Sequence, residues 1–425
     1  MINLLVILFT LAGIRSILLT KNGLENSLKF IIFAFVLGYR TFELIPGLKL
    51  HPIELFIYSC IIRIIISNAV KYREMSLAIS LLGIFFIAYF FIDFLTGYHF
   101  MVLLEFKNAF LLILIFFITQ HIHFSKSYFV RLLKYYLMAA SLISILGVIE
   151  YLFPSFMSSI FGFQSRSMNT PESIFFTRLA FLFWGTHLAA NLIAPVFPII
   201  LLLKVEKDSI VKNNYILTFL LMINLIAIYL SGNRISWLIL TILLLTIIFQ
   251  YRNFLVPYMK SYALLVTMIF VAYVYSQPVE GRYISTFKAL TGKIDTRYDS
   301  SGGARMARVQ IAINSIVEKP LGTGWGSQGW VHSDVLQIAA SVGIIPGIIF
   351  LIAPLFLLFR MYRAYLIAPI NDQTAFFVCC GLLIFIIISL YLNGNIMKVQ
   401  SGAPLLVLWA IADGYLTCYK QVDSS

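Results

Sequence analysis

Charged residues are scarce in this chain. Only 12% of its 425 residues are Asp, Glu, Lys or Arg, whereas 60% are apolar. Soluble domains are about a quarter charged and about half apolar, so the composition excludes an ordinary soluble globular protein. Sixty per cent of 425 residues is enough for about twelve membrane spans of about 20 residues each. The sequence therefore predicts an all-α, polytopic membrane protein with about 12 to 13 transmembrane helices, in which residues 1–425 form a single integral membrane domain.

Cysteine is also rare, and the four cysteines all lie in apolar segments: Cys60, Cys379, Cys380 and Cys418. A disulfide framework needs paired cysteines in loops, so we expect neither disulfides nor thiolate metal sites. The net charge of +13 would indicate a nucleic-acid binder only if the basic residues gathered on one water-exposed face. They are scattered through short connectors instead, and we expect no nucleic-acid partner.

Apolar runs separated by short connectors recur along the chain. The first run lacks the basic start of a signal peptide, and we expect it to remain as a span. The candidate runs are 3–19, 30–45, 53–69, 75–95, 101–119, 135–153, 179–203, 215–230, 235–249, 263–275, 335–359, 375–392 and 403–415. Basic residues of short loops stay in the cytoplasm, and they are about twice as numerous after odd-numbered runs. The connectors after even-numbered runs are therefore predicted to lie outside the cytoplasm.

One long hydrophilic segment, residues 276–334, follows an even-numbered run and is predicted to be an extracytoplasmic loop. Long ordered loops usually carry function. Between residues 304 and 317, apolar side chains recur at helical spacing. This spacing predicts an amphipathic helix that rests on the membrane surface or covers a cavity. Residues 300–303 precede it as a start signal, and Pro320 with Gly322 follows it as a stop signal.

Three arginines are candidates for anion binding. Arg234 ends a short break between two apolar runs, and two further runs separate it from the long loop, so both lie on the same side of the membrane. Arg305 and Arg308, three residues apart in the predicted helix, share a face. Guanidinium groups bind phosphate oxygens in a planar fork. The alternatives are a snorkelling Arg234 that caps a helix end, and a helix arginine pair that faces water or lipid headgroups.

A glycine-rich stretch leads to a histidine. Gly322, Gly324 and Gly326 precede His332 and Asp334. Glycine allows close backbone approach, so the stretch could deliver His332 to the mouth of a cavity at the top of the next span, although a plain turn explains it equally well. One histidine beside one aspartate lacks the three or four ligands that a metal needs, and no metal site is predicted.

Polar residues inside or beside the spans are further candidates, because they are costly in a membrane and tend to be functional. His187 and Asn191, four residues apart, would share one helical face and line a cavity. The alternative is hydrogen bonding between helices. Asp93 and Glu150 lie near span ends, where water can reach them.

The order of these motifs resembles the O-antigen polymerase and ligase superfamily, whose members are bacterial integral membrane glycosyltransferases with a large extracytoplasmic loop. The resemblance covers about residues 179–351. It rests on Ser231–Arg234, on Gly303-Ala-Arg305 followed by Pro320, on Gly322-Thr-Gly324, on His332-Ser-Asp-Val-Leu336 and on Gly343-Ile-Ile. Two positions depart from the family pattern: Ser333 replaces the usual asparagine, and Val309 replaces a frequent aromatic residue.

The resemblance implies transfer of a glycan from undecaprenyl diphosphate without a metal or cofactor. Arg234 and Arg305 correspond to family arginines that engage the diphosphate, and His332 corresponds to the family histidine, which would act as general base. Arg308, Asn191, His187 and Asp334 are the candidate substrate-binding residues. The implied location is the bacterial inner membrane, with the active site facing the periplasm or the cell exterior.

Three functions remain open at the level of sequence. The first is a surface polysaccharide polymerase of O-antigen or capsule type, which lengthens lipid-linked repeat units. The second is an O-antigen ligase, which transfers the glycan to lipid A core. The third is a flippase or transporter of lipid-linked oligosaccharide, although transporters usually show internal repeats and ionisable groups near the bilayer midplane. The family context also suggests a chain-length regulator and a flippase as partners, besides the bilayer itself.

Overall fold

The computed structural model describes residues 2–38, 41–45, 48–67, 77–96, 100–161, 192–231, 300–325, 327, 331, 333–392 and 399–423. These residues fall into two compact units, which we describe separately. Unit one is Met1–Tyr136 with Ala307–Ser425, and unit two is Leu137–Met306. The single membrane domain over the whole chain stays a prediction.

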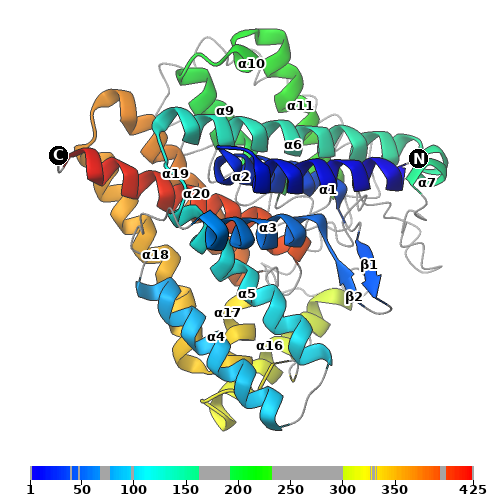
Figure 1. The fold of residues 1–425 in the computed structure, drawn as a ribbon, viewed down its shortest axis with the longest axis vertical. Helices are drawn as coiled ribbons and strands as arrows, with labels where there is room; N and C mark the ends of the chain where they lie inside the picture. The colour runs from blue at the N-terminus through cyan, green and yellow to red at the C-terminus, as the bar shows by residue number, and fades with distance from the viewer. Residues whose placement is uncertain are drawn as a thin grey trace. The chain divides into compact units, whose positions relative to one another are not determined.

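The described residues of unit one are helical apart from one small hairpin (Figure 1). Its N-terminal elements are α1 (Ile2–Leu19), α2 (Gly23–Ala34), the 3-10 turn η1 (Phe35–Leu37), β1 (Phe42–Ile45), β2 (Leu48–Leu50), α3 (Pro52–Ser67), α4 (Leu77–Thr96), α5 (Phe100–Gln120) and the start of α6 (Lys126–Leu152). Its C-terminal elements are most of α16 (Ser300–Glu318), α17 (Asp334–Val342), α18 (Ile344–Ile367), α19 (Ile370–Leu392) and α20 (Val399–Asp423). Helix α4 packs against α5 and α18, and α5 packs against α20.

The predicted all-α polytopic class is confirmed. Six helices among the described residues are long and apolar enough to cross a membrane: Leu77–Leu95, Lys126–Leu152, Asn214–Ser231, Ile344–Ile367, Asp372–Tyr391 and Gly402–Tyr419. Helix α18 shows why this is a membrane pattern. Its Phe350 and Leu357 are buried, whereas Ile352 and Phe359 are more than half exposed. A helix that is apolar on its outer side as well as its inner side is typical of a membrane span. The total of about 12 to 13 spans stays a prediction.

Two predicted runs are divided in the structure. Run 30–45 does not form one helix, because α2 ends at Ala34 and the chain turns at Gly38 (φ 58°) into the antiparallel hairpin β1–β2. Run 335–359 is split at Gly343 (φ 113°), which ends α17 and begins α18. A Cβ added to Gly347 would lie 2.6 Å from the Ala339 Cβ. In one continuous helix, residues eight apart would be about 12 Å apart, so α17 folds back onto α18.

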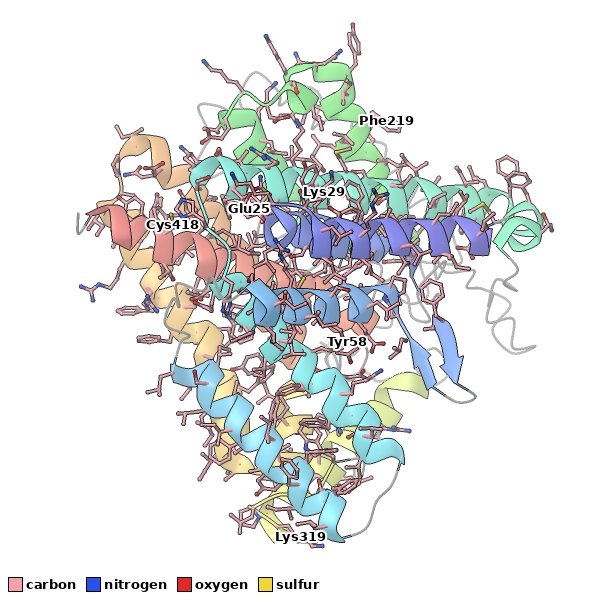
Figure 2. All side chains as sticks on the ribbon, viewed as in Figure 1. Glu25, Lys29, Tyr58, Phe219, Lys319 and Cys418 are labelled. Atoms are coloured by element: carbon pink, nitrogen blue, oxygen red, sulfur yellow. The ribbon has the colours of Figure 1, made fainter. Side chains whose placement is uncertain are left out.

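At one end of unit one, segments that follow odd-numbered apolar runs lie close together. The Arg63 guanidinium donates to the carbonyl oxygen of Leu18 at 2.7 Å, so the C-terminal ends of α3 and α1 lie together. The N-terminal ends of α6 and α19 meet through the ion pair between Lys126 Nζ and Asp372 Oδ1, at 3.0 Å. Figure 2 shows Glu25 and Lys29 near this end, well away from Lys319. Which side of the membrane this end faces stays a prediction.

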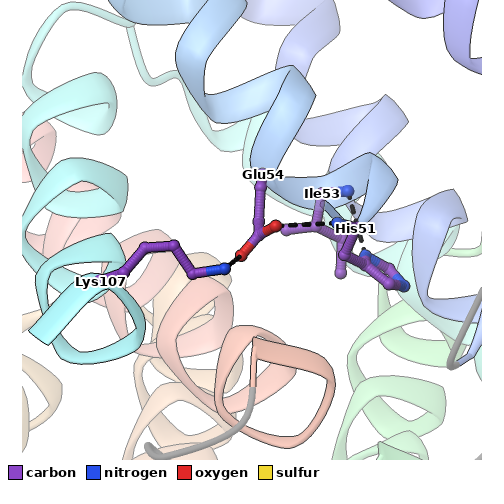
Figure 3. Close-up of polar contacts among 4 residues, drawn as sticks. All are labelled: His51, Ile53, Glu54 and Lys107. Carbon is purple, nitrogen blue, oxygen red and sulfur yellow. Dashed lines mark hydrogen bonds and ion pairs between the residues drawn. The ribbon is translucent and has the colours of Figure 1, made fainter. Parts of the chain in front are cut away.

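The opposite end of unit one contains a buried polar cluster (Figure 3). Glu54 Oε1 lies 2.6 Å from Lys107 Nζ, and its other carboxylate oxygen accepts the backbone N–H of His51 at 2.8 Å. The imidazole Nδ1 of His51 accepts the N–H of Ile53 at 3.1 Å. Its Nε2 must then carry the proton and donate to the carbonyl oxygen of Gly38, at 2.5 Å. His51 is thus neutral. Its two hydrogen bonds link Gly38, which precedes the hairpin, to the start of α3.

Acidification is expected to destabilise the protein through His51. Burial, which disfavours the charged ring, and the nearby positive charge of Lys107 lower the pKa of His51 to about 4, below its usual value of about 6.5. The unfolded chain therefore binds more protons between these values, and stability falls as the pH falls. We expect a loss of about 2 kcal/mol between pH 7 and pH 5, measured as thermal unfolding in detergent.

The control for this prediction keeps the other titratable groups, including Glu54 and Lys107, in place. His51→Gln should show a smaller loss between the two pH values than the wild type. His123→Gln, at an exposed position, should behave like the wild type. Equal pH dependence in the wild type and His51→Gln would contradict the prediction.

Unit two contains the rest of α6, followed by α7 (Pro154–Phe161), α9 (Val196–Val205), α10 (Ser209–Lys212) and α11 (Asn214–Ser231). Helices α6 and α11 are joined by buried polar side chains. Asn224 Nδ2 donates to Ser141 Oγ at 2.9 Å, and Ser144 Oγ donates to Asn224 Oδ1 at 2.8 Å. Such interhelical hydrogen bonds satisfy polar groups that membrane helices bury.

Candidate functional site

The glycine-rich stretch between α16 and α17 runs along the C-terminal part of α17. Thr323 N–H donates to the carbonyl oxygen of Ala340, and Gly324 N–H donates to that of Ser341, both at 2.9 Å. These bonds pair the stretch with the last carbonyl groups of α17, which have no partner within that helix. Thr323 and Gly324 are therefore bound to unit one through their backbone.

Two glycines in this stretch cannot carry a side chain without displacement. Gly322 and Gly324 have φ of 96° and 95°, in the left-handed region that favours glycine. A Cβ would lie 2.6 Å from the Ser341 carbonyl oxygen at the first position, and 2.7 Å from Asp93 Oδ1 at the second. The Gly-Thr-Gly motif is thus explained by close approach to α17 on one side and to α4 on the other.

Helix α4 contacts the stretch at Leu321 and at Trp325. Asp93 Oδ2 accepts the backbone N–H of Trp325 at 2.7 Å, and the Tyr89 hydroxyl donates to the carbonyl oxygen of Leu321. The Trp325 side chain is 2% exposed and packs edge-on against Phe86, with ring centroids 5.3 Å apart. The sequence placed Asp93 near a span end but gave no sign of this partner. The sequence does indicate that Asp93 is unusual, because an ionisable side chain among apolar neighbours in a membrane helix tends to be functional.

Removing the Asp93 carboxylate is expected to destabilise unit one. Asp93→Ala leaves the Trp325 N–H without its acceptor, and an unsatisfied buried donor costs about 1–3 kcal/mol. The measurement is the apparent unfolding temperature in detergent. Asp372→Ala is the matched control, because it breaks a partly exposed ion pair worth about 0–1 kcal/mol. If the two variants unfold at the same temperature, Asp93 does not hold the stretch in place.

Helix α16 confirms the predicted helix, with one correction at its start. The glycines expected to precede it lie inside it, since the helix begins at Ser300. One side is buried: Ala312 forms a small core with Val331 and Ala340, and Ile316 packs against it. Ile313 and Val317, on the adjoining side, are 40% and 75% exposed. The apolar arc is therefore half packed on protein and half free to contact lipid.

The N-terminus of α17 is capped by the residue after His332. Ser333 is the N-cap, and its hydroxyl oxygen accepts the N–H of Leu336 at 3.4 Å. Serine and asparagine are both preferred N-caps, so replacing the family asparagine with Ser333 preserves the helix start. Asp334 follows in the first turn, where a negative charge is favourable, and it is fully buried.

The structure describes only some of the predicted site residues. Arg308 is exposed on α16, and Asp334 is buried in α17. Arg305 lies in the N-terminal half of α16, but its side chain is not among those that the structure describes. The shared face of Arg305 and Arg308 therefore stays a prediction. Four predicted residues lie outside the described part of the chain: Arg234, His332, His187 and Asn191.

These features define a multi-pass membrane protein in which the hydrogen-bonded residues 321–325 and the capped start of α17 come before and after His332 in the chain. Residues 217–352 match the family model described as O-antigen ligase, which confirms the resemblance to the O-antigen polymerase and ligase superfamily. The match supports a membrane enzyme of the O-antigen ligase or polymerase type, similar to a glycosyltransferase. No curated protein matches the chain.

Proposed function

We propose that the chain is a surface polysaccharide polymerase, which transfers the growing glycan from undecaprenyl diphosphate onto the next lipid-linked repeat unit. The observation that carries the proposal is the extent of the family match. Residues 217–352 contain Arg234, Arg305 and His332 in the order that the resemblance requires. The proposed location is the bacterial inner membrane, with this chemistry on the periplasmic or outer side.

The proposed reaction is a displacement at the anomeric carbon of the donor sugar. A hydroxyl oxygen of the acceptor sugar bonds to that carbon, and the bond from the carbon to the diphosphate oxygen breaks. The electron pair leaves with the diphosphate, whose negative charge Arg234 and Arg305 stabilise. The hydroxyl proton passes to the neutral imidazole of His332. The scheme uses no metal or cofactor.

The arrangement of α16 supports a role for Arg305 in this reaction. The helix carries Arg305 in its N-terminal half, and farther along the same helix Ala312 packs against Val331, the residue before His332 in the chain. Arg308, Asp334, His187 and Asn191 are proposed to bind the glycan or the diphosphate as secondary contacts. The exposed Ile313 and Val317 would contact the bilayer, beside which the lipid carrier must lie.

The test uses purified protein and the polyprenyl-diphosphate-linked glycan extracted from cells that lack this chain. A polymerase makes longer lipid-linked products in the absence of lipid A. A ligase, the second candidate and the function named in the family description, transfers glycan only when lipid A core is added. Movement of the glycan across a vesicle bilayer without lengthening would instead indicate a flippase, and would overturn the proposal.

A further inference from the structure

The outer side of helix α18 carries a row of apolar side chains. With its other side the helix packs against α17, α19 and α4. The exposed row, which we call the α18 stripe, contains side chains that are each between 42% and 57% exposed: Ile345, Ile348, Ile352, Leu355, Phe356 and Phe359. These positions lie about one turn apart or side by side, so they form one continuous surface. An exposed apolar surface of this kind on a membrane helix contacts lipid.

The α18 stripe ends at two arginines. The guanidinium carbon of Arg360 lies 5.8 Å from the centre of the Phe356 ring, and that of Arg363 lies 5.9 Å from the centre of the Phe359 ring. Both distances are within the range of cation–π interactions. Each guanidinium therefore lies over the aromatic ring one turn earlier, at the end of the apolar surface.

The hydrogen-bond donors of these two arginines are not used by the protein. Neither Arg360 nor Arg363 has an ion pair or a hydrogen bond among the described residues. Arg63, by contrast, donates to the carbonyl oxygens of Leu18 and Thr20. A ring beneath a guanidinium attracts its charge but leaves its in-plane N–H groups available. Because residues three apart share an edge of a helix, the donors of Arg360 and Arg363 can converge on one anion.

The two arginines lie at the depth of the lipid headgroups. Helix α18 has 24 residues, or about 36 Å, which exceeds the hydrocarbon thickness of about 30 Å. The arginine end also carries Tyr362, which is 52% exposed, and tyrosine is enriched at membrane interfaces. Beyond the arginines, Leu366 and Ile367 are 59% and 77% exposed. The guanidiniums thus have exposed apolar neighbours on both sides, which favours a headgroup phosphate as their anion.

We propose that Arg360 and Arg363 form a headgroup site for an anionic phospholipid, whose acyl chains lie along the α18 stripe. Guanidinium groups bind phosphate oxygens in a planar fork. Two positive charges without a nearby carboxylate partner favour a lipid with net negative charge over a zwitterionic one. The connector after run 335–359 is predicted to be cytoplasmic, and anionic headgroups of the cytoplasmic leaflet attract basic residues. The site is separate from the proposed chemistry, and its test requires no turnover.

The experiment measures lipid binding by native mass spectrometry of the full chain in detergent, with phosphatidylglycerol as the anionic probe and phosphatidylcholine as the zwitterionic one. We expect the wild type to bind phosphatidylglycerol about tenfold more tightly than phosphatidylcholine, and Arg360→Gln/Arg363→Gln to lose this preference. Arg360→Lys/Arg363→Lys, which keeps the charges but not the forks, should have an intermediate Kd. Equal binding of both lipids by the wild type, or an unchanged Kd in the glutamine variant, overturns the inference.

Two controls accompany this measurement. Arg131→Gln removes one exposed positive charge from α6, where the residue one turn earlier is the exposed Ser127 instead of an aromatic ring, and it should retain the wild-type Kd. Excess inorganic phosphate, which has no acyl chain, should not displace phosphatidylglycerol. Displacement by phosphate would show a site for a free anion and would overturn the role of the α18 stripe.

A second measurement applies to the wild type alone, so it holds even if the double variants do not fold. Phosphatidylglycerol and phosphatidylcholine with the same photoactivatable acyl chain are crosslinked to the protein in vesicles, and the modified peptides are identified. Helix α4 is the internal reference, because it exposes Ile84 and Phe91 but contains no Lys or Arg. We expect the ratio of anionic to zwitterionic labelling to be about fivefold higher at residues 352–363 than on α4. Equal ratios on the two helices overturn the inference.

Discussion

Arg305→Ala is expected to lower the rate of glycan transfer by about 10³-fold, with an unchanged amount of protein in the membrane. As the bond to the diphosphate breaks, negative charge develops on the leaving group, and a fixed cationic donor stabilises that charge. Loss of one such donor costs about 10²–10³ in rate. The measurement is the length distribution of surface polysaccharide on complemented cells, together with the initial rate on extracted glycan lipid.

Two variants of α16 control this experiment. Arg305→Lys retains the charge but loses the planar fork that binds two phosphate oxygens, so we expect an intermediate rate. Gln310→Ala changes an exposed position on the same helix, where the amide pairs with Asn314 at 2.9 Å, and should retain the wild-type rate. Normal polymer length in Arg305→Ala would remove Arg305 from the mechanism.

His332→Ala is expected to lower the rate by about 10²–10⁴, the range that a general base contributes. A sugar hydroxyl is a weak nucleophile at neutral pH, and the imidazole accepts its proton as the new bond forms. Only the neutral imidazole can do so, and the rate of the wild type should therefore fall on acidification. The measurements are polymer length on cells and the initial rate as a function of pH.

The control for His332 is His123→Ala, an exposed histidine in the connector between α5 and α6, which should leave polymer length unchanged. His332→Ala and Arg305→Ala act on opposite parts of the reaction, the attacking hydroxyl and the leaving diphosphate. A His332→Ala protein that makes polymer of normal length would show that another group accepts the proton.

Local patterns in the sequence predict the local structure well. Apolar runs identify the spans because a membrane helix must satisfy its backbone internally and be apolar outside. The helical spacing between residues 304 and 317 predicts α16, since periodicity depends only on neighbouring turns. The same holds for the stop at Pro320, which follows the last helical residue Glu318. Each of these features is decided by residues within a few positions of one another.

Contacts between distant residues could not be predicted in this way. Hydropathy shows one run across Gly343, because both α17 and α18 are apolar; the break depends on the backbone angle at one glycine. Likewise, nothing near Asp93 in the sequence indicates Trp325, whose N–H it accepts. The hydrogen bond from the Val331 N–H to Gln337 could not be predicted either, since nothing in the sequence around Gln337 indicates its partner. Arg234 and His332 were found through a resemblance, and they lie outside the described residues.

The bond between Asp93 and Trp325 joins residues 232 positions apart, and this separation has a consequence for biosynthesis. A ribosome adds about 5–20 residues per second, so Trp325 is translated roughly 10 to 50 seconds after Asp93. During that interval α4 has been synthesised, whereas the glycine-rich stretch that contacts it has not. Assembly of the N-terminal helices is therefore completed only late in translation.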